Sequence, residues 1–187
     1  MSIVIAPPET KLITGEELLA MGDIGPTELI DGRIVQMSPT GGEHGQVEFD
    51  LGRLLGNFVA EHKRGWVMGG EVGIYIRRNP DRVRAADVAF ISRERLPHKP
   101  RPGFLEVAPE LVVEVISPND TWEEMRRKLE DYFSIGVDRV WVVEPENRAI
   151  VVYRSLTESQ VLNEGDVLKG AGVLEGFTLP VASLFEE

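Results

Sequence analysis

The sequence predicts an α/β or α+β domain, a mixed β-sheet with helices on its faces. Three observations support this prediction. Residues 43–62 repeat apolar side chains at helical spacing. Residues 111–117 read LVVEVIS, a nearly continuous β-branched run typical of a strand buried on both faces. The predicted elements then follow the order helix, three strands, helix, two strands.

The bulk composition bounds the organisation and the class of protein. With 187 residues and 42% hydrophobic content, we expect one domain over residues 1–187. It comprises an N-terminal helix and hairpin extension at 1–40, a core at 41–155 and C-terminal strands at 156–187. The formal net charge of −11 argues against broad charge-driven binding to nucleic acid, without excluding a local basic groove.

Composition also bears on redox chemistry and location. The chain has no cysteine, which excludes disulfides and thiolate zinc sites. It has no apolar run of about 18 residues, so we expect no membrane span. The opening residues lack the basic region of a signal peptide. We therefore expect a cytoplasmic protein.

The first elements follow from local signals. Thr14–Glu17 matches a capping box and predicts a short helix. Asp31-Gly32 lies between the apolar-rich arms of residues 28–37, which predicts a hairpin. A long helix is expected from about Glu43 to His62, because its apolar residues share one face: Val47, Leu51, Leu54, Leu55, Phe58 and Val59.

The central segments read as strands. Residues 66–76 and 83–91 predict two strands joined by the turn RRNPD, followed by a proline-rich loop at 93–108. Residues 111–117 are the third strand, and residues 139–154 predict two more around a Pro-Glu-Asn turn.

A helix follows the third strand. Asn119 or Asp120 is a good N-cap, Thr121–Glu124 forms a second capping box, and Gly136 fits the position after the helix. Short strands are expected in the tail.

Two carboxylates stand in apolar rows of neighbouring strands. Asp87 shares a strand face with Ala85 and Ala89, and Glu114 interrupts the buried run at 111–117. A buried unpaired charge is very costly, so each needs a partner, a proton or a metal. If the two strands are adjacent, the carboxylates converge, and a hard divalent cation such as Mg²⁺ would relieve their repulsion.

Lys128 is the third candidate. At about 100° per residue it lies about 40° from Tyr132, at the edge of a stripe formed by Trp122, Met125, Leu129 and Tyr132. From there it could lean toward Glu114 and stabilise charge on a phosphate. Arg127 points away from the stripe.

Structural alternatives exist for each candidate. Asp87 could pair with Arg84 or Arg139, and Lys128 with Glu124 one helical turn away.

Three further residues have weaker signals. His44 and Glu48 lie one turn apart at the start of the long helix and could be metal ligands or solvated residues. Glu71, beside Gly69-Gly70, has the weakest signal.

At these residues the sequence resembles a known family, the restriction-endonuclease-like proteins of the second Uma type in the PD-(D/E)XK nuclease superfamily. The matching pieces run from about residue 14 to 155: MSPTGGEHG, VRAADVAFI, PELVVEVISPND, RRKLEDYFSIGVDRVWVVEP and AIVVYR. The resemblance implies a restriction-endonuclease-like mixed sheet flanked by helices. It assigns Asp87 to the motif aspartate and Glu114 to the motif acid.

Two positions depart from the superfamily pattern. Ala86 replaces a proline before the aspartate, and Ile116 stands where a lysine belongs. Some branches carry that lysine on the next helix, where Lys128 fits. Superfamily members often place an acidic residue on the first long helix, and Glu48 matches it.

The resemblance implies hydrolysis of DNA phosphodiester bonds with Mg²⁺ or Mn²⁺ held by Asp87 and Glu114. Lys128 would stabilise charge, with Glu48 and His44 nearby. A homodimer is expected, because cutting a duplex with one site per chain usually needs two copies. Two rivals stay open. One is a catalytically degraded module for protein interaction, and the other is a metal hydrolase with His44 and Glu48 as primary ligands.

Overall fold

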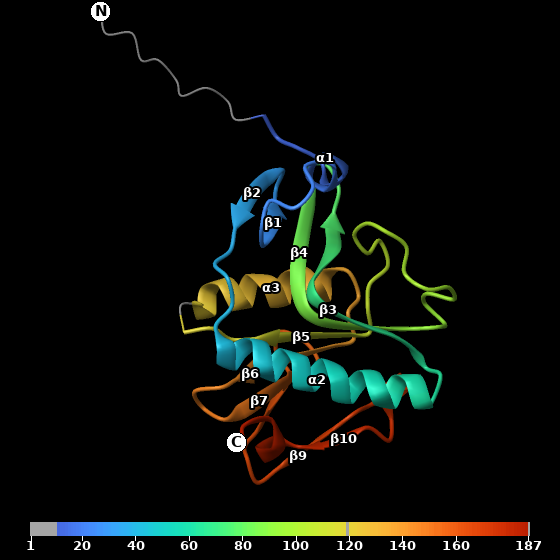
Figure 1. Ribbon diagram of the computed structural model, residues 1–187, viewed down its shortest axis with the longest axis vertical. Coiled ribbons are helices and arrows are strands. Elements are labelled where there is room, and N and C mark those ends of the chain that lie inside the picture. The colour runs from blue at the N-terminus through green and yellow to red at the C-terminus, as the bar shows by residue number, and fades with distance from the viewer. Residues whose placement is uncertain (1–10, 119, 187) are drawn as a thin grey trace, which may run out of the picture.

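An eight-stranded mixed sheet forms the centre of the chain (Figure 1). The computed structural model describes residues 11–118 and 120–186. The strand order is β2-β1-β4-β5-β6-β7-β8, with β3 also paired to β4. Within the described residues, β5 and β6 are parallel and the remaining pairs are antiparallel. The strands are β1 (Thr27–Ile30), β2 (Arg33–Gln36), β3 (Gly65–Arg77), β4 (Arg82–Ser92), β5 (Leu111–Val115), β6 (Arg139–Glu144), β7 (Ala149–Tyr153) and β8 (Ser159–Leu162).

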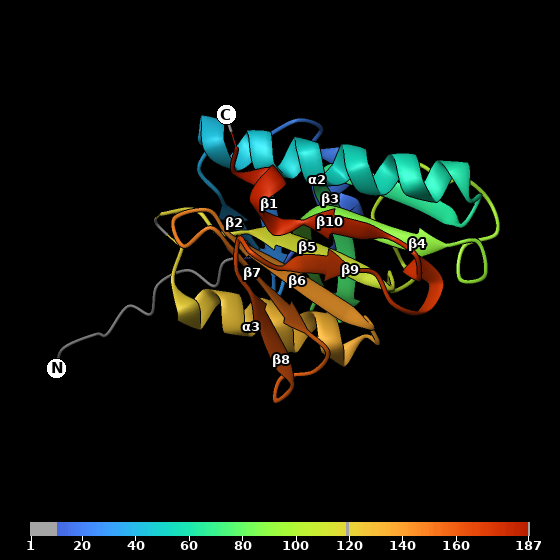
Figure 2. The same cartoon turned by 90° about the horizontal axis from the view of Figure 1, so that it is seen from below.

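Helices cover both faces of this sheet. The helices are α1 (Gly15–Ala20), α2 (Gly42–Glu61) and α3 (Trp122–Ser134). Figure 2 shows α2 and α3 on opposite sides of the strands. A small two-stranded sheet of β9 (Val167–Lys169) and β10 (Thr178–Pro180) packs on the α2 side, together with short 3₁₀ helices at Gly172–Leu174 and Val181–Leu184. The predicted mixed sheet with flanking helices and an N-terminal hairpin is confirmed.

Local signals set most element boundaries. Both capping boxes form, Thr14 with Glu17 and Thr121 with Glu124. The N-cap of α3 is Thr121, so the expectation of Asp120 was wrong; the alternative, Asn119, lies outside the described residues. The Asp120 carboxylate instead accepts a hydrogen bond from the Ser117 N–H at 2.8 Å.

The β5 strand is buried on both faces, as its sequence predicts. Its odd-numbered residues pack with the apolar stripe of α2, and Val112 packs with α3. The stripe of α3 is shorter than expected, because Trp122 at the first helical position is 57% exposed. The buried apolar residues of α2 are Val47, Leu51, Leu55 and Val59.

Strands β3 and β4 form a long curved ribbon that crosses the middle of the sheet (Figure 1). Their register shifts between Gly69 and Val72, and Glu71 inside this bulge has a positive φ of 59°. β-Bulges bend a strand and redirect its side chains. The hairpin β1–β2 joins the same ribbon through the pair Leu29–Val83.

The hairpin turn has the predicted conformation, because Asp31 and Gly32 both have positive φ. Across the described ranges, no helix combines the length and apolar character needed to cross a membrane.

Candidate metal centre and active site

Asp87 and Glu114 lie on adjacent strands, which is the condition under which their carboxylates could converge. β4 and β5 pair at Val88–Val113, Ala89–Val112 and Phe90–Leu111. Continuing this register by one residue sets Asp87 opposite Glu114. The Val115 N–H donates to Asp87 Oδ2 at 2.6 Å, so the carboxylate accepts a bond where the backbone ladder ends. Both acidic side chains are buried.

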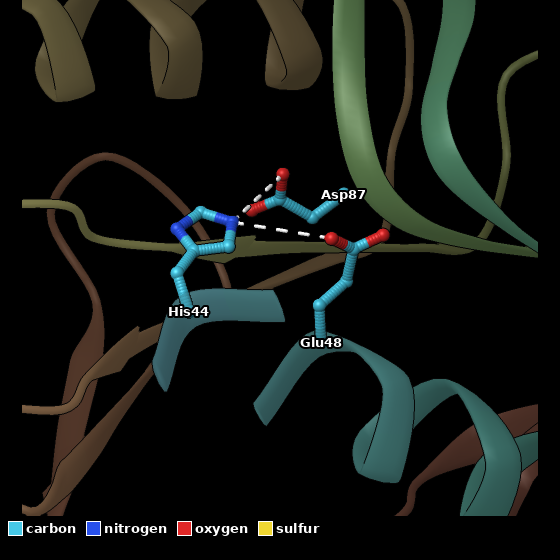
Figure 3. Close-up of side chains that lie close together, drawn as sticks. All are labelled: His44, Glu48 and Asp87. Carbon is cyan, nitrogen blue, oxygen red and sulfur yellow. Dashed lines mark ion pairs between the residues drawn. The ribbon is translucent and has the colours of Figure 1, made fainter. Parts of the chain in front are cut away.

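Asp87 also meets the first turns of α2. Figure 3 shows His44 and Glu48 pointing from this helix toward Asp87. His44 Nε2 lies 3.4 Å from Asp87 Oδ1 and 4.0 Å from Glu48 Oε2. Ligand atoms of the three residues lie within 4.8 Å of one another, which is a group that could hold a metal ion. The helical spacing of His44 and Glu48 brings them to one face, and the curved ribbon brings Asp87 to them.

Two further polar atoms of this group, His44 Nδ1 and Glu48 Oε1, are held by neighbours. His44 Nδ1 lies 2.9 Å from Ser117 Oγ, and the Gly70 N–H donates to Glu48 Oε1 at 3.0 Å. His44 Nε2 is buried and makes no hydrogen bond. Buried polar atoms are usually satisfied, so an unsatisfied imidazole nitrogen facing two carboxylates is a candidate ligand atom.

Burial and charge shift the pKa values here. Burial opposes the charged imidazolium of His44, but the close polar approach of the Asp87 carboxylate and its charge, with smaller contributions from Glu48 and Asp120, outweigh it and raise its pKa. Burial raises the pKa of Glu48, and the nearby charge of Asp87 adds to this. The nearby carboxylates thus create a negative potential that favours a proton or another cation at this group.

Lys128 reaches Glu114 from α3. Its Nζ lies 2.6 Å from Glu114 Oε2, and the Tyr132 hydroxyl donates to Glu114 Oε1. Burial raises the pKa of Glu114 to about 7, with Lys128 opposing and Asp87 adding to the shift. Burial alone would lower the pKa of Lys128, but Glu114 and Glu28 raise it above its ordinary value. Lys128 is therefore a charged ammonium beside the carboxylate of β5.

Two residues that the sequence suggested as partners of Asp87 and Lys128, Arg84 and Glu124, contact other residues instead. Arg84 binds Glu28 and Asp131, with its NH1 2.6 Å from Glu28 Oε2 and its Nε 2.7 Å from Asp131 Oδ2. Glu124 caps the start of α3 through Thr121 instead of pairing with Lys128.

Glu71 lies near the group without joining it. Burial raises its pKa, and the charges of Asp87 and Glu48 add to the shift.

Three residues near the site were missed by the sequence reading. Tyr132 was counted in the apolar stripe, although its spacing of four from Lys128 predicts a shared helix face. Ser117 follows β5 directly and was treated only as the start of a loop. Glu28 lies in the hairpin, and its position gives no local signal of a contact with α3.

The sheet order, the flanking helices and the acid–acid–lysine arrangement define a protein of the restriction-endonuclease-like fold class. The chain belongs to the Uma2 family, described as "Putative restriction endonuclease", which matches residues 16–182. Among solved structures it resembles "a putative nuclease belonging to DUF820" from Anabaena variabilis ATCC 29413. The TM-score is 0.77 at 20% identity, over 92% of this chain and 97% of that one. No curated protein matches the chain.

Proposed function

We propose that the protein is a divalent-metal-dependent endonuclease that hydrolyses phosphodiester bonds of DNA. The observation that carries this proposal is the contact of Lys128 with Glu114, 2.6 Å apart, beside the group of His44, Glu48 and Asp87. Lys128 of α3 would supply the cation beside Glu114 that is missing just after β5, where Ile116 occupies the usual lysine position. Family membership and the fold of the Anabaena protein support the same reaction class.

A divalent cation fits the donor set of this site. Asp87 would share an ion with His44 and Glu48, the three residues whose ligand atoms lie within 4.8 Å. Glu114 is not one of these three residues and would join them from the paired strand β5. Glu114 accepts one bond at each oxygen, and each carboxylate oxygen has a second lone pair for a cation. Carboxylate oxygens suit Mg²⁺ and Mn²⁺, and the unsatisfied His44 nitrogen favours Mn²⁺ of these two. When bound, such an ion polarises a phosphoryl oxygen and lowers the pKa of a bound water.

The side chains of the chain would supply positioning and charge. Lys128 stays protonated through its two carboxylate neighbours, so it can stabilise negative charge that develops on a phosphate. Tyr132 and Lys128 hold the two oxygens of Glu114 in one orientation. Ser117 holds the imidazole of His44 through Nδ1, which leaves Nε2 facing Asp87.

A local group of basic residues offers a route for DNA onto an acidic protein. The end of α2 and the loop after β4 lie side by side, since the Arg93 N–H donates to the Arg64 carbonyl at 3.0 Å. Lys63 and Arg93 are exposed there, and Lys99 and Arg101 are exposed further along the same loop. Phosphate contacts of this kind position a duplex without reading its sequence. Action on DNA in the cytoplasm is part of the same proposal.

Cleavage of supercoiled plasmid in Mn²⁺ or Mg²⁺ tests the proposal. The wild-type protein should produce nicked and then linear DNA, EDTA should stop the reaction, and Asp87→Asn should be inactive. Arg127→Ala is the matched control, because Arg127 is exposed and pairs only one helical turn away, with Glu123 at 2.6 Å. A wild-type protein that neither cleaves nor gains thermal stability from Mn²⁺ would support the non-catalytic module instead.

The same variants separate the proposal from the second rival. If His44 and Glu48 were the primary ligands without Asp87, then Asp87→Asn would retain most of the metal response. Asp87 is 3.4 Å from His44 and belongs to the strand that pairs with the strand of Glu114, so we expect its loss to remove the response completely.

A further inference from the structure

Glu28 is a buried carboxylate of the N-terminal hairpin, and it faces Lys128. It lies in β1 and is 5% exposed. Its Oε2 accepts from Arg84 NH1 at 2.6 Å, and its Oε1 accepts from the Ala85 N–H at 3.1 Å. The same Oε1 lies 3.9 Å from Lys128 Nζ. The lysine therefore has a second carboxylate neighbour, contributed by the N-terminal hairpin.

Lys128 lies between carboxylates from two different strands. Glu114 of β5 is in direct contact with the ammonium at 2.6 Å, and Glu28 of β1 stands at 3.9 Å. A lysine side chain has four rotatable bonds and loses considerable entropy when it is fixed. One contact leaves the ammonium free to swing around Glu114, whereas a second charge restricts its direction.

The ion pairs of this region are balanced without the Glu28–Lys128 approach. Glu28 already pairs with Arg84, Arg84 also binds Asp131, and Asp131 binds Arg82 at 2.6 Å. Lys128 has Glu114. Neutralisation of buried charge therefore does not explain why Glu28 faces the lysine, while orientation of the ammonium does.

We infer that Glu28 is a positioning residue that orients Lys128, so that the N-terminal hairpin completes the active site. The inference rests on the proposed nuclease role of Lys128. Glu28 acts through Lys128 and does not itself touch DNA or metal. Its loss should therefore reduce the rate of cleavage while metal and DNA binding persist.

Single-turnover cleavage at saturating Mn²⁺ and DNA tests the inference. Glu28→Gln should lower the rate by about tenfold or more, because small misplacement of a catalytic group is costly. The DNA Kd and the Mn²⁺-dependent rise in Tm should stay at wild-type values. Glu28→Asp keeps the charge opposite Arg84 but shortens the side chain. Its cleavage rate should therefore lie between the rates of the wild type and Glu28→Gln.

Asp131→Asn is the matched control. Asp131 is also buried and binds the same Arg84. Among the ion pairs of the described residues, its carboxylate contacts Arg82 and Arg84 and not Lys128. It should therefore disturb Arg84 but keep its cleavage rate within about twofold, because Lys128 retains both of its carboxylate neighbours. Equal loss of rate in Asp131→Asn and Glu28→Gln would show a purely structural role and overturn the inference.

A second readout does not depend on cleavage. In ¹⁵N-lysine NMR, a buried and hydrogen-bonded ammonium exchanges slowly with solvent, and the Lys128 signal is assigned by its loss in Lys128→Ala. Glu28→Gln should speed this exchange several-fold, and Asp131→Asn should not. If the wild type fails to cleave DNA, the proposed function fails while this measurement still decides the positioning role. An unchanged Lys128 signal in Glu28→Gln overturns the inference.

Discussion

Replacement of Lys128 by alanine has two separable consequences that the structure allows us to work out. Lys128 Nζ lies 2.6 Å from the carboxylate of Glu114, which is 2% exposed. Lys128→Ala removes the proposed charge-stabilising donor and also leaves Glu114 buried with the Tyr132 hydroxyl alone. Lys128→Ala should therefore also lower stability, because Lys128 balances a buried charge.

The effect on activity follows from the first consequence. Loss of one preorganised donor costs on the order of 10²–10³ in kcat. Glu48 and Asp87 remain in place, so the Mn²⁺-dependent rise in Tm should persist. The expected result is a slow variant that still binds metal.

The effect on stability depends on pH, with a defined sign. The pKa of Glu114 is already raised by burial to about 7, from an ordinary value of 4.5, and removal of Lys128 raises it further. A folded-state pKa above the unfolded value gives stability that is fully present below pH 4.5 and is lost as the pH rises. One retained proton costs about 1.4 kcal/mol per pH unit, so the variant should lose at most about 3 kcal/mol between pH 6 and 8.

Urea unfolding in metal-free buffer at pH 6 and pH 8 measures this difference, and plasmid cleavage in Mn²⁺ measures the rate. The double variant Lys128→Ala with Glu114→Gln should recover stability at pH 8, since it has no carboxylate to protonate. Arg127→Ala should match wild type in both assays. If Lys128→Ala cleaves at the wild-type rate while Asp87→Ala is inactive, Lys128 does not supply the charge-stabilising group of the site.

Further predictions concern metal, lysine position, DNA and assembly. Mn²⁺ at about 100 times its Kd should stabilise the wild type by about 2.7 kcal/mol, and Asp87→Asn should abolish the shift in Tm. Ile116→Lys should restore part of the activity of Lys128→Ala, and no recovery in a folded double variant would exclude that position. Lys99→Ala with Arg101→Ala should weaken DNA binding and lower its salt dependence by about two charges, as measured by titration at several salt concentrations. Light scattering at micromolar concentration should give the mass of a homodimer, and a monomer mass would contradict that expectation.

Elements with strong local signals were predictable from sequence. The stripe of α2 repeats every three or four residues, and β5 is a short β-branched run, so both could be placed within about two residues. The capping box at Thr121 marks the start of α3, although Asn119 and Asp120 were also plausible N-caps from the sequence. Helical periodicity places Lys128 beside Tyr132 at the edge of the buried stripe, and its ammonium lies 2.6 Å from Glu114 in the structure.

Contacts between distant segments were not predictable in the same way. His44 meets Asp87 because the β3–β4 ribbon curves around a bulge, and the bulge has no sequence pattern that fixes its geometry. Glu28 approaches Lys128 because the hairpin pairs with β4 through Leu29 and Val83, a long-range choice. Trp122 was misplaced because periodicity alone does not show where a neighbouring layer ends.

The lysine of this site illustrates why side-chain reach is a better guide than spacing along the chain. Ile116 lies two residues after Glu114 and packs with the apolar cluster under α3, where a lysine of the usual spacing would project. Lys128 of α3 donates to Glu114 Oε2, and Tyr132, one helical turn later, donates to Glu114 Oε1. The ammonium thus contacts the acid directly, although it is fourteen residues further along the sequence. What the proposed chemistry requires is a cation fixed beside Glu114, and any backbone element that can hold it there satisfies that requirement.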